Sequence, residues 1–310
     1  MKLFNKKISL GMGLAGLFVV SSVVYSLGYK MAMVKFNSVV SSNQEKQKLY
    51  GSLSEIDYNI RNEYIGSLDE DKILGGIYKG YVEGIEDENC KIMTREEYNA
   101  EIEKRSSDIS WDIIDNTIGY LRCGVLGKDS AEMLQERLQY FISENIENIV
   151  LDLRNCSHGE CDEVFKFLEY AAPKGHLIYH MNKKQEKELA CESKSDGVNV
   201  KFFVITNEET SGASELLAVV LRDFLNAKVV GNQTLGNNTK DKIVEISENL
   251  VLKFPNATYV SSKGTDIYKI GVIPDKVIDI TESEKESLKK GQLPYSQDAQ
   301  LQGAISLIKG

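Results

Sequence analysis

One segment in the second half of this 310-residue chain constrains the fold more than any other. Val200 to Thr206 is a short apolar run that suits a strand buried on both faces. Thr210 or Ser211 is a suitable N-cap for a helix after it. Apolar residues then recur at helical spacing: Ala213, Leu216, Leu217, Val220, Leu221 and Phe224. A strand, a tight turn and a helix in this order direct backbone N–H groups at one point.

The pattern before this segment alternates between strand and helix. Strand candidates lie at 118–122, 148–153 and 176–180, and helical spacing occurs at 131–141 and 164–171. Strands that alternate with helices pair in parallel, with the helices on the faces of the sheet. We therefore predict an α/β core with a mostly parallel sheet. The charged stretch from Lys183 to Asp196 is expected to be a solvated loop.

The turn itself carries a family signature. The run N-E-E-T-S-G-A-S-E from Asn207 to Glu215 resembles the S-A-S-A-S-E motif of the C-terminal processing peptidases (tail-specific proteases), which use a Ser–Lys pair. The resemblance places the family's catalytic serine on Gly212. The family's F-G-K-G-x-V-Q motif then places its base lysine on Asn237 and the glutamine that orients this lysine on Asp241.

These three replacements remove the chemistry that the resemblance implies. Glycine has no hydroxyl, and the asparagine amide does not titrate and is no base. We therefore expect no intact catalytic residue and a pseudoprotease. The alternative is an active serine-type endopeptidase with a relocated nucleophile, for which Ser211 is the first candidate. Whether the chain is an enzyme stays open at this point.

A second motif supports the same resemblance. Leu151 to Asn155 reads L-D-L-R-N and resembles the family's L-D-L-R-x-N-P-G-G, which ends a strand and supplies backbone to the oxyanion hole. Cys156 and Ser157 follow, and then His158 stands where the family has a glycine. The predicted peptide groove, which would also hold an oxyanion, is formed by Gly212, Ala213, His158 and Gly159.

Three further motifs occur in the family's order: G-G-I-Y-K-G-Y-V-E-G-I within 74–97, G-V-I-P-D at 271–275 and D-A-Q-L-Q at 298–302. The resemblance implies a core related to the crotonase and Clp protease superfamily. The family usually inserts a PDZ domain before the first core strand, and about a dozen residues stand there between Arg105 and Ile118. Because a PDZ domain captures a C-terminal carboxylate, this chain lacks the usual device for selecting substrates.

The N-terminal region predicts a single transmembrane helix. No charged residue occurs from Ile8 to Tyr29, and Lys2, Lys6 and Lys7 precede this run. We expect the cell membrane as location, with the N-terminus cytoplasmic and the bulk of the chain extracytoplasmic. A cleaved signal peptide is the alternative, because small residues occur at 26–28. The predicted parts are the stub and anchor at 1–30, a juxtamembrane helical segment at 31–117 and the core domain at 118–310.

The net charge and the cysteine spacing limit the classes of partner and ligand that we expect. A net charge of −9 argues against nucleic acid, because phosphate binding needs a basic face. Cys156, His158 and Cys161 are close in sequence, but their spacing matches no standard zinc site, and we predict neither a metal nor a cofactor. A disulfide such as Cys156–Cys161 stays open, although five cysteines leave at least one thiol unpaired.

The function expected from the sequence is therefore that of a membrane-anchored, extracytoplasmic homologue of serine-type C-terminal processing peptidases that binds a peptide or protein. By resemblance, the segment from Leu49 to Ile65 could join two copies in a homodimer, and a helix packed on its own domain is the alternative for this segment. Pairing with an active paralogue is the other option for a partner. A decaying paralogue without a ligand is the third reading, which the intact apolar patterning disfavours.

Overall fold

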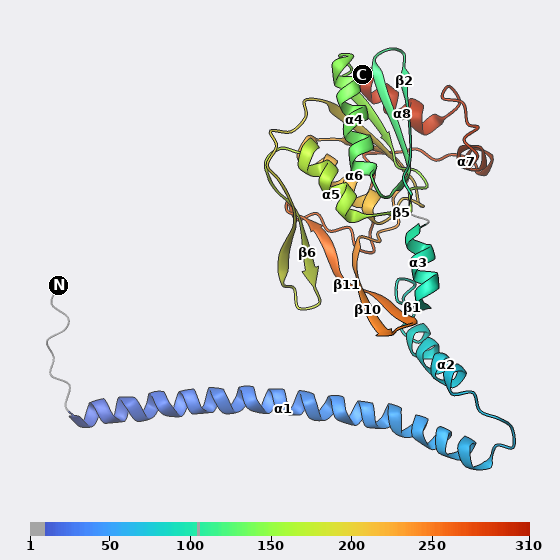
Figure 1. Ribbon diagram of the computed structural model, residues 1–310. Helices are drawn as coiled ribbons and strands as arrows, with labels where there is room; N and C mark the ends of the chain where they lie inside the picture. Colours follow the sequence, from blue (N-terminus) through green and yellow to red (C-terminus); the bar gives the residue numbers. More distant parts are fainter. Residues whose placement is uncertain (1–9, 104–105) are drawn as a thin grey trace. The chain divides into compact units, whose positions relative to one another are not determined.

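The computed structural model describes residues 10–103 and 106–310, which form two compact units that divide at Gly76 (Figure 1). The first unit consists mainly of helix α1 (Leu10–Glu63). Near the end of α1, Arg61 forms two hydrogen bonds of 2.6 and 2.7 Å with the carboxylate of Glu70. Helix α2 (Glu70–Glu83) begins there and continues past Gly76.

The predicted anchor from Ile8 to Tyr29 begins in residues 1–9, outside the described part of the chain. Within residues 10–103 and 106–310, no helix combines the length and the apolar character that crossing a membrane requires. The transmembrane part of the predicted fold therefore finds no support in the structure.

The second unit contains the predicted α/β core. Its seven-stranded sheet has the order β12-β9-β8-β4-β3-β2, with β5 beside β3. The strands are β2 (Asp108–Ile114), β3 (Ile118–Leu126), β4 (Asn148–Asp152), β5 (His158–Gly159), β8 (Lys201–Thr206), β9 (Lys228–Gly231) and β12 (Lys276–Val277). All neighbours pair in parallel except β2 and β3. The predicted α/β class with a mostly parallel sheet is confirmed for this part.

Helices cover both faces of this sheet. On one face lie α4 (Ser130–Ser143), α5 (Cys161–Ala171) and α6 (Ala213–Leu225), whose apolar side chains form the main core. On the other face, α8 (Ala299–Lys309) closes a smaller core. Strand β8 contributes to both, because Phe202 and Val204 belong to the first core and Phe203 and Ile205 to the second. Its apolar run therefore reflects burial on two faces, as predicted.

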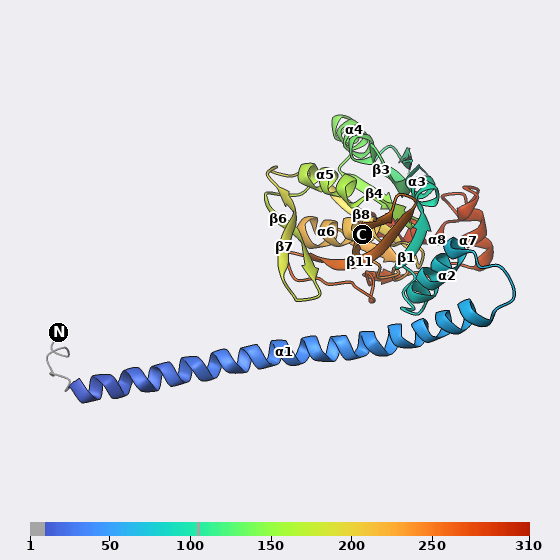
Figure 2. The same ribbon diagram turned by 60° about the horizontal axis from the view of Figure 1, so that its bottom comes forward.

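A second sheet of five strands was not predicted, and all its pairs are antiparallel. It contains β1 (Lys91–Thr94), β6 (Gly175–Asn182), β7 (Lys187–Ser193), β10 (Thr239–Ser247) and β11 (Leu250–Ser261). The strand predicted at 176–180 is part of β6 and lies in this sheet, beside β7 (Figure 2). The remaining helices are α3 (Arg95–Glu103) and α7 (Glu282–Lys289).

The observed strands correct two expectations. The stretch from Lys183 to Asp196 is not a loop throughout, because β7 occupies its centre and buries Cys191 and Ser193. Alternating burial holds these two side chains inside while the charged neighbours stay outside. The segment 31–117 also differs from the expected helical segment, since it contains two strands. Strand β1 belongs to the five-stranded sheet and β2 to the seven-stranded sheet.

Candidate functional site

The strand–turn–helix junction ends in an unusual backbone conformation at Gly212. Strand β8 ends at Thr206, and Gly212 precedes α6 with φ +67° and ψ −121°. Residues with a Cβ atom adopt such positive φ values rarely and at a cost. A Cβ atom at Gly212 would meet one neighbour within 4 Å, the carbonyl oxygen of Asn237, at 3.6 Å. The turn therefore has room for a side chain, and its backbone favours glycine.

The predicted N-cap at Thr210 or Ser211 is wrong, because Gly212 occupies the N-cap position of α6. The Thr210 hydroxyl instead donates to the carbonyl of Leu153 at 2.8 Å, and it accepts from the N–H of Asn207 at 3.0 Å. These bonds hold the loop after β8 against the end of β4.

Glu215 is the residue that fixes the turn, and the sequence reasoning gave it no role. Its carboxylate is fully buried and accepts from the N–H groups of Gly212, Gly236 and Asn237 at 2.9, 2.6 and 2.8 Å. It also accepts from the hydroxyl of Thr234. Burial raises the pKa of Glu215, against the effect of these hydrogen bonds. An acidic residue three positions after the N-cap is a signal that could have identified this role.

Asn237, on which the resemblance places the family's base lysine, is an amide with fixed partners. The Nδ2 of Asn237 donates to Oδ1 of Asn89 at 2.9 Å, and its Oδ1 accepts from the Thr239 hydroxyl at 3.3 Å. Both bonds are those of a neutral amide, which neither takes up nor releases a proton near neutral pH. Asn237 therefore positions the segments 87–91 and 237–241 without supplying a base.

Asp241, on which the resemblance places the family's glutamine, is a carboxylate that interacts with a charged neighbour. Oδ2 of Asp241 lies 3.5 Å from Nζ of Lys253, and this ammonium lies 2.7 Å from Oε1 of Glu101. The side chain of Lys253 is only 12% exposed. The ammonium therefore has two acidic partners, Asp241 and Glu101, in the wall of the pocket.

These positions share one pocket of about 530 Å³. Its walls come from the Gly212 turn, the segment 157–162, the start of β10 and the segment 89–101. The pocket is lined by Gly212, Asn237 and Asp241, which lie within 29 residues of one another in the sequence. The structure thus brings together the three positions at which the resemblance places the family's chemistry.

Three of the four predicted groove residues, Gly212, Ala213 and Gly159, lie in this pocket. Ala213 and Gly159 line the pocket, and a Cβ atom on Gly159 would lie 3.2 Å from the Cβ of Ala213. Ala213 is the first residue of α6, where N–H groups have no partner within a helix. Its N–H is therefore the candidate donor to a bound carbonyl or carboxylate. The side chain of His158, the fourth predicted groove residue, lies outside the described part of the structure.

The serines beside Gly212 are engaged elsewhere. The Ser211 hydroxyl donates to the carbonyl of Ser157 at 3.3 Å, and the Ser214 hydroxyl donates to the carbonyl of Cys156 at 2.6 Å. Both side chains are buried. Near the turn, the hydroxyl of Thr234 donates to the carboxylate of Glu215. Thr234 is buried, however, and does not line the pocket.

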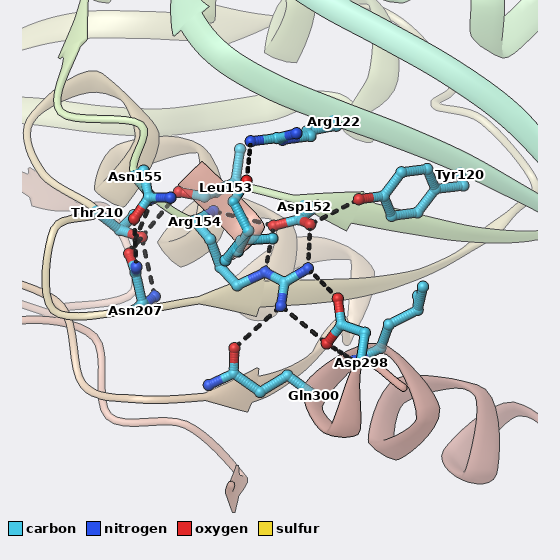
Figure 3. Close-up of polar contacts among 12 residues, drawn as sticks. Tyr120, Arg122, Asp152, Leu153, Arg154, Asn155, Asn207, Thr210, Asp298 and Gln300 are labelled. Carbon is cyan, nitrogen blue, oxygen red and sulfur yellow. Dashed lines mark hydrogen bonds and ion pairs between the residues drawn. The ribbon is translucent and has the colours of Figure 1, made fainter. Parts of the chain in front are cut away.

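A buried ion cluster lies at the end of β4, beside this region (Figure 3). The guanidinium of Arg154 donates to both oxygens of Asp152 at 2.9 and 2.6 Å, and to both oxygens of Asp298 at 2.9 and 2.6 Å. Gln300 accepts a further bond at 3.2 Å, and the Tyr120 hydroxyl donates to Asp152 at 2.7 Å. Burial alone would raise the pKa of Asp152, but Arg154 outweighs burial and lowers it.

Two asparagines connect this cluster to the Gly212 turn (Figure 3). The backbone N–H of Asn155 donates to Oδ1 of Asn207 at 2.9 Å, and Nδ2 of Asn207 returns a bond to Oδ1 of Asn155 at 2.7 Å. Asn155 adopts a left-handed conformation with φ +60°. The loops after β4 and β8 are therefore clamped to each other, which positions both walls of the pocket.

The cysteines near the pocket are not bridged. The Cys156–Cys161 disulfide that the sequence left open does not occur in the structure. Cys156 is buried, and burial raises its pKa to about 12. Cys161 lines the pocket at the first position of α5.

Comparisons with known proteins agree with this architecture. Over 194 residues, the chain is 24% identical to a carboxyl-terminal-processing protease of Synechocystis sp., covering 63% of this chain and 44% of the relative. Over 160 residues, it is 28% identical to the chloroplastic carboxyl-terminal-processing peptidase 2 of Arabidopsis thaliana, covering 51% of this chain and 31% of the relative. The chain therefore spans less than half the length of these two curated relatives.

The solved structure of a lipoprotein from Streptococcus agalactiae has a similar fold, with a TM-score of 0.57 at 17% identity, covering 77% of this chain and 88% of the other. The model of peptidase family S41 matches residues 117–278, which is more than half of the chain. This stretch includes Gly212, the segment around Asn237 and the L-D-L-R strand. The chain is a member of peptidase family S41.

Proposed function

We propose that this chain is a catalytically inactive member of the serine-type C-terminal processing peptidases that binds an extended peptide or protein segment in the pocket beside Gly212. One observation carries the proposal. The strand–turn–helix junction has an open pocket in front of it, and Gly212, on which the resemblance places the nucleophile, lines this pocket.

The loss of activity follows from how a nucleophile works. A serine hydroxyl attacks only when a neighbouring base removes its proton, and the loss of one member of such a unit removes most of its rate. Here the Gly212 position has no hydroxyl, and Asn237 provides no base. Neither Ser211 nor Ser214 replaces the nucleophile, because both are buried and donate to backbone carbonyls.

The capacity to bind is supported by the walls of the pocket. Strand β10 pairs with β11 and with no other described strand, so its second edge is open to an added strand. Thr239, Lys240 and Asp241 at the start of β10 line the pocket. An extended peptide that adds to this edge through backbone hydrogen bonds would lead to the Gly212 turn. No catalytic side chain is needed for this mode of binding.

The location and the partners belong to the same proposal, with the sequence as their support. The uncharged run from Ile8 to Tyr29 would hold the chain in the cell membrane with the binding pocket outside the cytoplasm. Ligands would then be extracytoplasmic peptides, and an active paralogue is a candidate partner. Membrane fractionation with external protease digestion tests this: loss of the pocket unit on digestion of intact cells supports it, and protection contradicts it.

Binding is tested by fluorescence anisotropy of labelled, unstructured peptides with the full chain. Thr239→Trp places a large side chain in the pocket wall, and Lys187→Trp adds the same side chain at an exposed position of β7, at the far edge of the same sheet. We expect Thr239→Trp to weaken binding several-fold and Lys187→Trp to leave it unchanged. Mass spectrometry of the recovered peptide should show no shortening. Equal affinities of both variants would contradict the proposed site, and a shortened peptide would contradict the inactivity.

A further inference from the structure

Strand β2 forms one edge of the seven-stranded sheet (Figure 1). Among the described strands it pairs only with β3. The N–H of Ile113 donates to Oδ1 of its neighbour Asp112 at 2.8 Å and so is not used by β3. Since alternate residues of an antiparallel strand direct both backbone groups to the same side, Ile109, Trp111 and Ile113 direct theirs to the open edge.

An exposed aromatic cluster lies on one face of this edge. Trp111, the one tryptophan of the chain, is 41% exposed although its ring centroid is 5.3 Å from that of Tyr140. The guanidinium of Arg137 lies 5.1 Å from the centre of the Trp111 ring. Ile142, which lies on helix α4 together with Arg137 and Tyr140, is also exposed. Tryptophan, tyrosine and arginine are the residues most enriched at the energetic centres of protein interfaces.

The charge pattern of the edge selects a specific partner strand. We propose that β2 pairs antiparallel with β2 of a second copy of this chain, about a two-fold axis at Trp111. This register pairs all seven residues of β2, and it places Ser110 opposite Asp112 and Ile109 opposite Ile113 of the second copy. Trp111 faces its own counterpart. Asp108 then lies opposite Ile114, so that no acidic side chain directly faces another.

The neighbouring symmetric registers lack this property. An axis at residue 110 would place Asp108 directly opposite Asp112 of the second copy, and an axis at residue 112 would place the two copies of Asp112 opposite each other. Like charges directly opposite across two strands are destabilising. The two aspartates therefore act against the shifted registers and leave the one centred on Trp111.

The hydrogen bonds of the edge fit the same register. Ile109, Trp111 and Ile113 have outward backbone groups, and the register pairs these residues with one another, as hydrogen-bonded pairs require. The N–H of Ile113 would exchange its bond with Asp112 for the carbonyl of Ile109 in the second copy. Because two short strands bury less surface than a standard interface, we expect a reversible dimer.

Cysteine cross-linking tests both the contact and its register. In the full chain, Ser110→Cys and Asp112→Cys change exposed side chains at the edge. Residues 110 and 112 of two copies would form a non-hydrogen-bonded pair with Cα atoms about 4.5 Å apart, within the range for a disulfide. A mixture of the two variants under a mild thiol oxidant should therefore give several-fold more disulfide-linked dimer than either variant alone. Wild type, with its five native cysteines, is the control.

The cross-linking result tests the register and the contact separately. A mixture that links no better than Ser110→Cys alone or Asp112→Cys alone would overturn the register, and cross-linking no greater than in wild type would overturn the contact. As a second readout, the emission of Trp111 should shift to longer wavelength on dilution, as the dimer dissociates. The variant Trp111→Lys, which places a charge at the centre of the edge, should sediment as a smaller species than wild type. Unchanged sedimentation would contradict the proposal.

Discussion

The buried cluster at the end of β4 and the pocket beside it at the end of β8 are built from different kinds of contact. In the cluster, Arg154 meets Asp152 and Asp298 through four hydrogen bonds, and its side chain is 1% exposed. In the pocket, Gly212, Asn237 and Asp241 stand where the resemblance places the family's chemistry. The comparison teaches that buried polar contacts, rather than the residues that line the pocket, hold the loops after β4 and β8 in place.

The largest expected effect comes from breaking the buried cluster. Arg154→Met leaves the carboxylates of Asp152 and Asp298 buried without their cation, and we expect the free energy of unfolding to fall by about 3–5 kcal/mol. Urea denaturation followed by circular dichroism measures this loss. Lys309→Met is the matched control, because Lys309 and Asp115 form an exposed pair at 3.0 Å that contributes at most about 1 kcal/mol. Equal losses in the two variants would contradict the role given to the cluster.

A smaller effect is expected at the turn of the pocket. Gly212→Ala should lower the free energy of unfolding by about 1–3 kcal/mol, because its φ of +67° is strained for a residue with a Cβ atom. Gly264→Ala is the control, since Gly264 also has a positive φ, of +92°, with open space around it. Similar losses in both variants indicate that backbone strain alone sets the cost and that the pocket accepts a side chain. A much larger loss at Gly212 would show that the pocket is closed.

The smallest effect is a pH dependence that originates in Glu215. Its pKa is raised in the folded chain above the usual value of 4.5, so its contribution to stability is complete below pH 4.5 and is lost as the pH rises through the raised pKa. Glu215→Gln removes this titration. The difference in unfolding free energy between wild type and variant should therefore shrink as the pH rises from 4.5 towards 7. A difference that stays constant or grows would contradict a raised pKa.

The sequence predicted the regular part of the molecule and missed what depends on long-range contacts. Hydrophobic spacing identified β8 and α6, because an unbroken short apolar run is typical of a buried strand and apolar residues at helical spacing are typical of a helix. It placed residues 176–180 in the parallel sheet, although β6 pairs with β11 and β7, because periodicity does not show which strand lies next to which. The β7 strand was hidden by exposed charged residues that alternate with Cys191 and Ser193.

The site was predicted in part for similar reasons. Motif resemblance identified Gly212, Asn237 and Asp241, and the structure brings them to one pocket. It did not identify the four hydrogen bonds that Glu215 accepts, since three of the donors lie on a distant segment of the chain. The contacts of Asn89 and Glu101 with this site also depend on tertiary structure, because both lie more than 100 residues away in sequence.

The central claim, a complete peptidase frame without its nucleophile, is tested most directly by the peptidase activity of two proteins on an unfolded substrate with an apolar C-terminus. One is the wild-type chain, and the other is the triple variant Gly212→Ser, Asn237→Lys and Asp241→Gln. Our account predicts no cleavage by wild type and measurable cleavage by the triple variant. Cleavage by wild type that Ser211→Ala abolishes would contradict the account and identify a relocated nucleophile.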